Sequence, residues 1–225
     1  MSISIYTLAV NTNMPDETNL LSIAAKGGFL MIVLLLISLV AITIIIERLI
    51  KLRKSQKIED EFLQEIYGHL GNKNTEKAIQ ICEEKKDNPI ANVFAKAIES
   101  LDNNIAEIKE IIETSIKKEI HQFEKNLGTL ATFAAIAPLI GFLGTVTGMV
   151  KVFMKISGTG GGVDITLLAN GIWEALITTI GGLTVGIITI LFYNYLVGKV
   201  ESLAQELEEN SHEFIFNIRR IKNED

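Results

Sequence analysis

The chain has 225 residues, of which 48% are hydrophobic and 21% are charged, and its formal net charge is −6. A single cysteine (Cys82) excludes a disulfide framework and a CxxC metal site, and the three histidines form no metal motif. The acidic balance excludes a basic surface for nucleic acid. Without a nucleophile–base pair or a nucleotide motif, we expect a protein that is not an enzyme and that binds no cofactor or metal.

Three long runs of the sequence are almost free of charge. They cover residues 27–46, 126–150 and 165–198, and Glu174 is the only charged side chain within them. About 20 apolar residues of helix span the hydrocarbon core of a bilayer, so each run is long enough to cross it. The fold class predicted is an all-α integral membrane protein with three transmembrane helices.

The positions of the lysines and arginines orient these helices. One lies in residues 1–27, fourteen lie in residues 47–127, and four lie from Lys199 onward. The positive-inside rule then places the N-terminus outside and the C-terminus in the cytoplasm. The predicted parts are an outward-facing N-terminal segment (1–26), the first transmembrane helix (27–47), a cytoplasmic helical domain (48–125), the second transmembrane helix (126–151), a short periplasmic link (152–164), the third transmembrane helix (165–198) and a cytoplasmic C-terminal helix (199–225).

The cytoplasmic segments are expected to be helical, with a break at Gly68–Asn74. Apolar residues at steps of three and four predict one helix face that runs without interruption into the second span: Ile105, Ile108, Ile112, Ile116, Ile120, Phe123, Leu127 and Leu130. The tail has a similar stripe at Val200, Leu203, Leu207, Phe214, Ile218 and Ile221. Two long membrane helices are therefore expected to extend into a cytoplasmic helical bundle.

Glu174 is the residue to which the sequence most clearly assigns a function. Counted from Asp164, it lies about 15 Å along a helix, near the middle of the membrane. A charge at that depth costs about 2.5–3.5 kcal/mol on insertion scales, and such residues usually face a bundle interior or a water-filled path. A carboxyl group that is loaded with a proton or a cation suits a proton-coupled protein. The alternative is a neutral glutamic acid that only hydrogen-bonds a neighbouring helix.

Threonines and small residues accompany Glu174 on the second and third spans. Threonine in a membrane helix usually bonds its own carbonyls, so each one taken singly is more often structural. Two threonine-bearing helices and one carboxyl group together favour a narrow polar path for a small cation. Pro138, Gly141 and Gly148 are expected to serve close helix packing or a kink. Because three spans cannot enclose a channel alone, the chain must assemble with copies of itself or with a partner.

Four segments resemble one known family. They are IIIERLIKLRK (44–54), APLIGFLGTVTGMV (137–150), GIWEALITTIGGL (171–183) and FYNYL (192–196). They are similar to the corresponding segments of the MotA/TolQ/ExbB proton-channel family, and the length and three spans favour an ExbB- or TolQ-like member.

The resemblance implies a homopentamer in the bacterial inner membrane, among its lipids, around an ExbD- or TolR-like dimer. In the family, proton motive force drives relative motion of ring and partner, and the work reaches TonB-dependent outer-membrane transport or the Tol–Pal system. The resemblance assigns the ion pathway to Glu174, Thr145 and Thr179, and expects the main proton acceptor, an aspartate, on the partner. Thr178 and Thr147 are additional hydroxyls near this path, and they leave Na⁺ open beside H⁺ as the transported ion.

The chain departs from the family pattern at Ile188, where many members have a proline. The resemblance therefore carries no kink or gating role to that position. A non-conducting membrane scaffold, in which Glu174 makes only an interhelical hydrogen bond, remains the alternative function.

Overall fold

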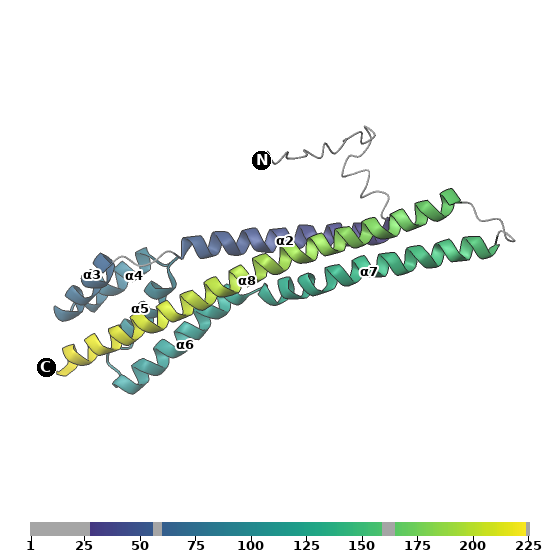
Figure 1. Ribbon diagram of the computed structural model, residues 1–225. Helices are drawn as coiled ribbons and strands as arrows, with labels where there is room; N and C mark the ends of the chain where they lie inside the picture. Colours follow the sequence, from purple (N-terminus) through teal and green to yellow (C-terminus); the bar gives the residue numbers. More distant parts are fainter. Residues whose placement is uncertain (1–27, 56–59, 159–164, 224–225) are drawn as a thin grey trace, which may run out of the picture. The chain divides into compact units, whose positions relative to one another are not determined.

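The computed structural model describes residues 28–55, 60–158 and 165–223, and within these ranges it contains helices and turns but no strand. The helices are α2 (Gly28–Lys54), α3 (Asp60–Gly71), α4 (Thr75–Glu84), α5 (Pro89–Glu99), α6 (Ile105–Glu124), α7 (Leu127–Gly158) and α8 (Ile165–Asn223) (Figure 1). Three helical stretches are long and apolar enough to cross a membrane: Gly28–Lys54, Ile105–Gly158 and Leu168–Lys222. The predicted all-α membrane class is confirmed. The predicted N-terminal segment (1–26) and residues 159–164 of the predicted link lie outside the described residues.

Helix α7 extends into the predicted link, whereas α8 joins the predicted third span to the C-terminal segment. Helix α7 continues to Gly158, so residues 152–158, assigned to the link, are helical. Helix α8 runs for 59 residues, from Ile165 to Asn223, and passes Ile188 without a break. It contains no proline, and a proline in a helix interior would remove one backbone hydrogen bond. The third span and the C-terminal segment thus form one helix, as the sequence predicted.

The prediction of an uninterrupted helix into the second span is wrong at Lys125 and Asn126. Helix α6 ends at Glu124, Asn126 has a φ of 66°, and α7 begins at Leu127. The carbonyl of Gln122, near this helix end, accepts hydrogen bonds from Arg48 Nη1 at 2.8 Å and Lys51 Nζ at 3.2 Å. Cationic side chains favourably satisfy the carbonyls that a helix C-terminus leaves without partners. The apolar stripe continues across this break, which is why periodicity alone did not reveal it.

Asparagine side chains cap the N-termini of helices α4, α5 and α6. Asn74 accepts from the backbone N–H of Lys77, Asn88 accepts from Ile90, and Asn104 accepts from Glu107 at 2.9 Å. Each bond satisfies a backbone donor that the first turn of a helix leaves free. The preceding helix α3 ends at Gly71, within the predicted break.

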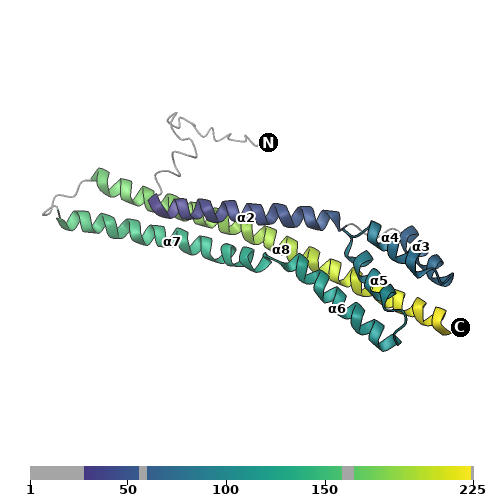
Figure 2. The same ribbon diagram turned by 180° about the vertical axis from the view of Figure 1, so that it is seen from behind.

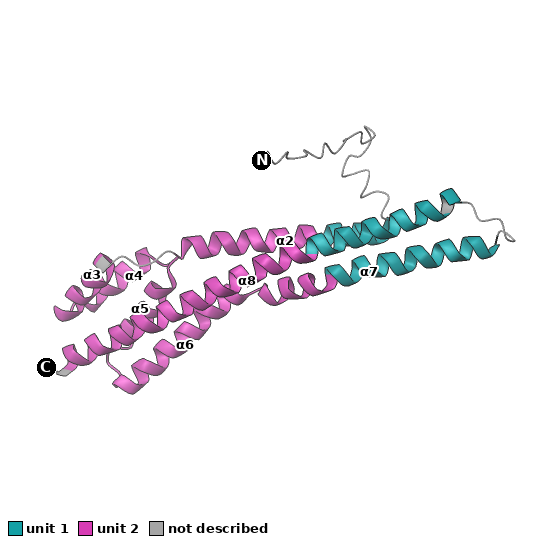
Figure 3. Cartoon of the chain, in the orientation of Figure 1, with its two compact units in different colours: residues 1–36, 137–185 teal, residues 37–136, 186–225 magenta. Residues whose placement is uncertain are grey.

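The chain divides into two compact units, which are coloured separately in Figure 3. Unit 2 comprises residues 37–136 and 186–225, and its core contains the predicted stripes of α6 and α8. Figures 1 and 2 both show α3 beside α4, and α6 beside the C-terminal part of α8. The rings of Phe94 and Phe214 lie with their centroids 4.4 Å apart, and both side chains are fully buried. Most residues of both stripes are buried, which confirms the amphipathic pattern.

Unit 1 comprises residues 1–36 and 137–185, of which residues 28–36, 137–158 and 165–185 are described. It holds the start of α2, the larger part of α7 and the first third of α8. All the predicted ion-pathway residues lie in this unit.

Candidate functional site

A glycine-rich face of α7 brings this helix into close contact with α8. A Cβ atom built on Gly141 would lie 3.1 Å from the Cα of Gly182, and one built on Gly148 would lie 2.8 Å from the Cβ of Ala175. A Cβ on Gly144 would collide with the side chain of Thr178. Small residues allow membrane helices to approach this closely. Gly141 and Gly148 therefore lie at the contact between the helices, and Pro138 lies inside α7 one turn before it.

Glu174 points its carboxylate at a lysine of the neighbouring helix. Its Oε1 atom lies 3.5 Å from Nζ of Lys151, and the side chains of Glu174 and Lys151 are 36% and 66% exposed. Glu174 lies nine residues after the start of α8, and Lys151 lies seven residues before the end of α7. Lys151 is the last residue of the predicted second span (126–151), and α7 places it beside the carboxylate.

The first residue of α2, Gly28, lies close to the same carboxylate. A Cβ atom on Gly28, whose φ is +68°, would lie 2.8 Å from Oε1 of Glu174. Position 28 therefore favours glycine for two reasons, because the backbone is left-handed and because a methyl group would press on the carboxylate. The N-terminus of a helix also favours a neighbouring negative charge.

The carboxylate of Glu174 lies level with Gly28, the first described residue of α2. Helices α7 and α8 both continue past this level. The depth obtained by counting from Asp164, near the middle of the membrane, stays a prediction.

Two hollows flank the Glu174–Lys151 pair. One, of about 300 Å³, is lined by Gly148, Lys151, Val152, Lys155, Thr166, Asn170, Gly171 and Glu174. The other, of about 280 Å³, is lined by Gly28, Phe29, Leu30, Leu143, Gly144, Thr147, Lys151, Glu174 and Thr178. Only Lys151 and Glu174 line both.

The structure separates the five residues of the predicted ion path, three of which the resemblance assigned and two of which, Thr147 and Thr178, were additional hydroxyls. Thr147 and Thr178 line the same hollow as Glu174, and the Thr178 hydroxyl donates to the Glu174 carbonyl at 2.9 Å. Thr145 donates to the carbonyl of Phe142, and Thr179 donates across the helix contact to the carbonyl of Gly141 at 2.8 Å. Neither Thr145 nor Thr179 lines either of these two hollows. Of the four predicted threonines, the two that were secondary in the sequence are thus the ones that share a hollow with Glu174.

Lys151 was missed as a site residue because it directly follows the uncharged run 126–150, and only charged residues within the runs were considered for the ion path. A signal was present, since Gly144, Gly148 and Lys151 follow one another at steps of four and three on one helix face. Gly28 carried no comparable signal, because its importance depends on how α2 meets α8.

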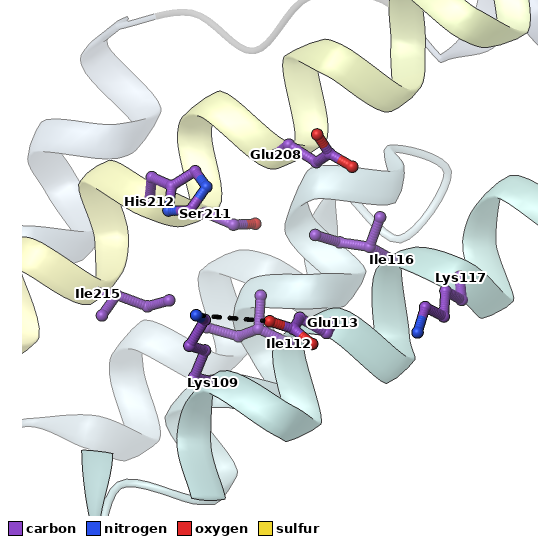
Figure 4. Close-up of a pocket in the computed structure, with 9 residues that line it drawn as sticks. All are labelled: Lys109, Ile112, Glu113, Ile116, Lys117, Glu208, Ser211, His212 and Ile215. Carbon is purple, nitrogen blue, oxygen red and sulfur yellow. Dashed lines mark ion pairs between the residues drawn. The ribbon is translucent and has the colours of Figure 1, made fainter. Parts of the chain in front are cut away.

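A third hollow, of about 380 Å³, lies between α6 and α8 in unit 2 (Figure 4). Ile112, Ile116 and Ile215 line it together with charged residues of both signs, and Lys109 pairs with Glu113 at 3.7 Å. Figure 4 shows the hydroxyl of Ser211 directed from α8 toward this space. The hollow belongs to the amphipathic bundle and lies outside the uncharged runs that contain the predicted ion path.

The described residues contain no group of three or more His, Cys, Asp or Glu side chains that could hold a metal ion. Burial raises the pKa of the Cys82 thiol to about 12. Cys82 packs within the core of unit 2.

Comparison with known proteins matches residues 85–209 to the model of the MotA/TolQ/ExbB proton channel family. An ExbB-like protein of Synechocystis sp. is 32% identical over 174 residues, which cover 76% of this chain and 68% of that protein. An ExbB homolog of Methanothermobacter thermautotrophicus is 33% identical over 121 residues, and the match spans 54% of this chain but only 42% of that protein. The Tol-Pal system protein TolQ of Haemophilus influenzae is 28% identical over 224 residues, which cover 92% of this chain and 96% of that protein. Together with three membrane-crossing helices, these matches indicate a multi-pass membrane protein.

Proposed function

Because the chain belongs to the MotA/TolQ/ExbB proton channel family, we propose that it is the ring-forming subunit of a proton-driven motor in the bacterial inner membrane. The ring, a homopentamer, surrounds a dimeric ExbD-like partner and energises TonB-dependent transport across the outer membrane. H⁺ is the transported ion.

The observation that carries this proposal is the position of Glu174. It is the single charged side chain of the three apolar runs, and it lines two hollows beside hydroxyl groups. A carboxylate that only stabilised a helix contact would be expected to point into packed side chains rather than into open space. Each elementary charge that crosses the membrane potential releases about 2.3 kcal/mol per 100 mV, so several protons must pass in turn to perform work. A ring of identical subunits, each with its own Glu174, suits the passage of protons one after another.

Some residues of unit 1 bind the ion in this proposal, and others hold the helices in position. Glu174 takes up and releases the proton, and Thr147 and Thr178 supply hydroxyl oxygens in the same hollow. Thr179 fixes α8 against α7 through its bond to Gly141, and Thr145 lies on the adjacent face of α7. The glycine contacts hold the two helices at the separation that this arrangement requires.

Proton uptake into liposomes tests the proposal directly. The chain is co-reconstituted with its ExbD-like partner, a potassium gradient with valinomycin sets the membrane potential, and an internal pH dye reports the flux. We expect Glu174→Gln to abolish the flux while native mass spectrometry shows the same complex. The matched control is Glu208→Gln, a carboxylate of the same helix in unit 2, which should leave the flux unchanged. Wild-type flux in Glu174→Gln would overturn the proposal.

A TolQ-like role in the Tol–Pal system is the second candidate. It is favoured by one observation, namely that the match to the Haemophilus influenzae TolQ extends over 92% of this chain. Complementation of strains lacking either ExbB or TolQ separates the two roles, because growth on a TonB-dependent iron source and resistance to detergent report different systems. A non-conducting scaffold predicts that Glu174→Gln weakens assembly, which native mass spectrometry would detect, and that wild-type liposomes show no flux.

A further inference from the structure

We propose that Lys151 is the gate of the ion path, closing it by pairing with Glu174. This inference rests on the proposed function, because it assumes that Glu174 carries the proton. It adds a residue to which the family resemblance assigned no role.

The geometry of the two hollows supports the gate. The first hollow is polar, with Lys155, Thr166 and Asn170 in its lining, and the second contains Gly28, Thr147 and Thr178. Within the described part of the chain, Lys151 and Glu174 are the residues common to both linings, and their charged atoms lie 3.5 Å apart. The ion pair therefore forms the part of the wall that the two hollows share, and this is where we place the gate.

The charges around the pair give it two states. Among the residues that the structure describes, the charged members of the two linings are Lys151, Lys155 and Glu174, so Glu174 is the carboxylate in these linings that pairs with the ammonium group. While Glu174 is ionised, the attraction holds Lys151 at the shared wall. Once Glu174 has taken up a proton, it is neutral and this attraction is lost. Lys151 has a flexible four-carbon stem and is 66% exposed, so it is free to swing toward solvent.

The cycle follows from these two states. Loading Glu174 with a proton releases Lys151 and joins the hollows, and unloading Glu174 restores the pair and separates them again. The carboxylate thus opens the path only when it holds a proton. No covalent bond forms or breaks except at the transferred proton, which moves onto and off the Glu174 carboxyl group.

Four variants test the gate in liposomes that contain the chain without its partner. In Lys151→Met the stem is kept and the charge is removed, so we expect the basal proton leak to rise by about tenfold, the equivalent of about 1.4 kcal/mol in barrier height. Lys151→Arg keeps the charge and should keep the leak low. Lys155→Met, one turn further along α7 in the lining of a single hollow, is the matched control and should also keep it low. The double variant Lys151→Met/Glu174→Gln should lose the leak again, because the leak passes through the carboxyl group.

The outcomes separate the gate from the proposed function. A wild-type leak in Lys151→Met, with an unchanged oligomer by native mass spectrometry, overturns the gate. If Lys151→Met does not assemble, Lys151→Gln provides the same test with a polar side chain. If the wild-type complex with its partner carries no proton flux at all, the proposed function fails instead. A leak that rises equally in Lys155→Met shows a general loss of positive charge and also overturns the gate.

Discussion

The close contact between α7 and α8 is tested most sharply by Gly182→Ala. A Cβ atom at this position would lie 2.5 Å from the carbonyl oxygen of Ala137, 2.7 Å from the Cα of Gly141 and 2.9 Å from its backbone nitrogen. All three are backbone atoms, so no side chain can rotate away and the helices themselves must separate. Overpacking of this kind costs about 1–3 kcal/mol. Three backbone contacts under 3.0 Å place this variant in the upper part of that range, about 2–3 kcal/mol. Alanine recovers about 1 kcal/mol of helix propensity, so we expect a net loss of about 1–2 kcal/mol.

Gly198→Ala on the same helix is the matched control. Nothing lies within 4 Å of a Cβ built there, so only the gain in helix propensity applies, about 0.5–1 kcal/mol. For a chain of this size 1 kcal/mol moves the unfolding midpoint by about 2–4 °C. Thermal melts of the detergent-purified protein, followed by circular dichroism, should therefore fall for Gly182→Ala and rise for Gly198→Ala. Equal midpoints for Gly182→Ala and the wild type would refute the contact between α7 and α8 at this position.

The remaining predictions concern unit 2. Arg48→Met should lower the free energy of unfolding by about 1.5–3 kcal/mol, because Arg48 is 3% exposed and its loss removes a charge-assisted hydrogen bond to the Gln122 carbonyl. Chemical denaturation of the purified protein measures this change. An unchanged denaturation midpoint would contradict the contact between Arg48 and Gln122. Asn126→Gly should be tolerated, whereas Asn126→Val should cost about 1–2 kcal/mol in the same assay, because a φ of 66° suits glycine and opposes a β-branched side chain. Because burial raises the pKa of Cys82 from 9.0 to about 12, the folded protein should resist maleimide at pH 8 and react on unfolding. The same shift makes the folded state lose stability as pH rises from about 9 to 12, because at the start of that range the thiol ionises in the unfolded chain but not in the folded one. If Cys82→Ala and the wild type lost stability equally over this pH range, the burial of the thiol would be contradicted.

The membrane class of the fold was predictable because it depends on composition over long segments. Three runs of about 20 or more apolar residues have few alternatives to membrane helices, and the stripes of α6 and α8 are buried as their periodicity predicted. The break at Asn126 was not predictable in this way. It is a property of one backbone torsion angle, and the side-chain pattern resumes on its far side.

The candidate site was predictable in its central residue but not in its surroundings. Glu174 stands out because a lone charge in an apolar run is unusual in any sequence. Lys151 and Gly28 come from other helices, and their contact with Glu174 depends on how far α7 extends and where α2 begins. Sequence spacing sets neighbours along one helix, whereas neighbours across helices depend on register.

The capping of Gln122 by Arg48 and Lys51 has a consequence for how the protein is made. These two residues are among the basic residues that follow the first apolar run, and under the positive-inside rule their charges help to orient α2 while the chain enters the membrane. After folding, the same two groups are bonded to a carbonyl near the end of α6. Under the predicted orientation, they act first as a topology signal and later as a helix cap, and that cap can form only after residues 105–124 have been synthesised.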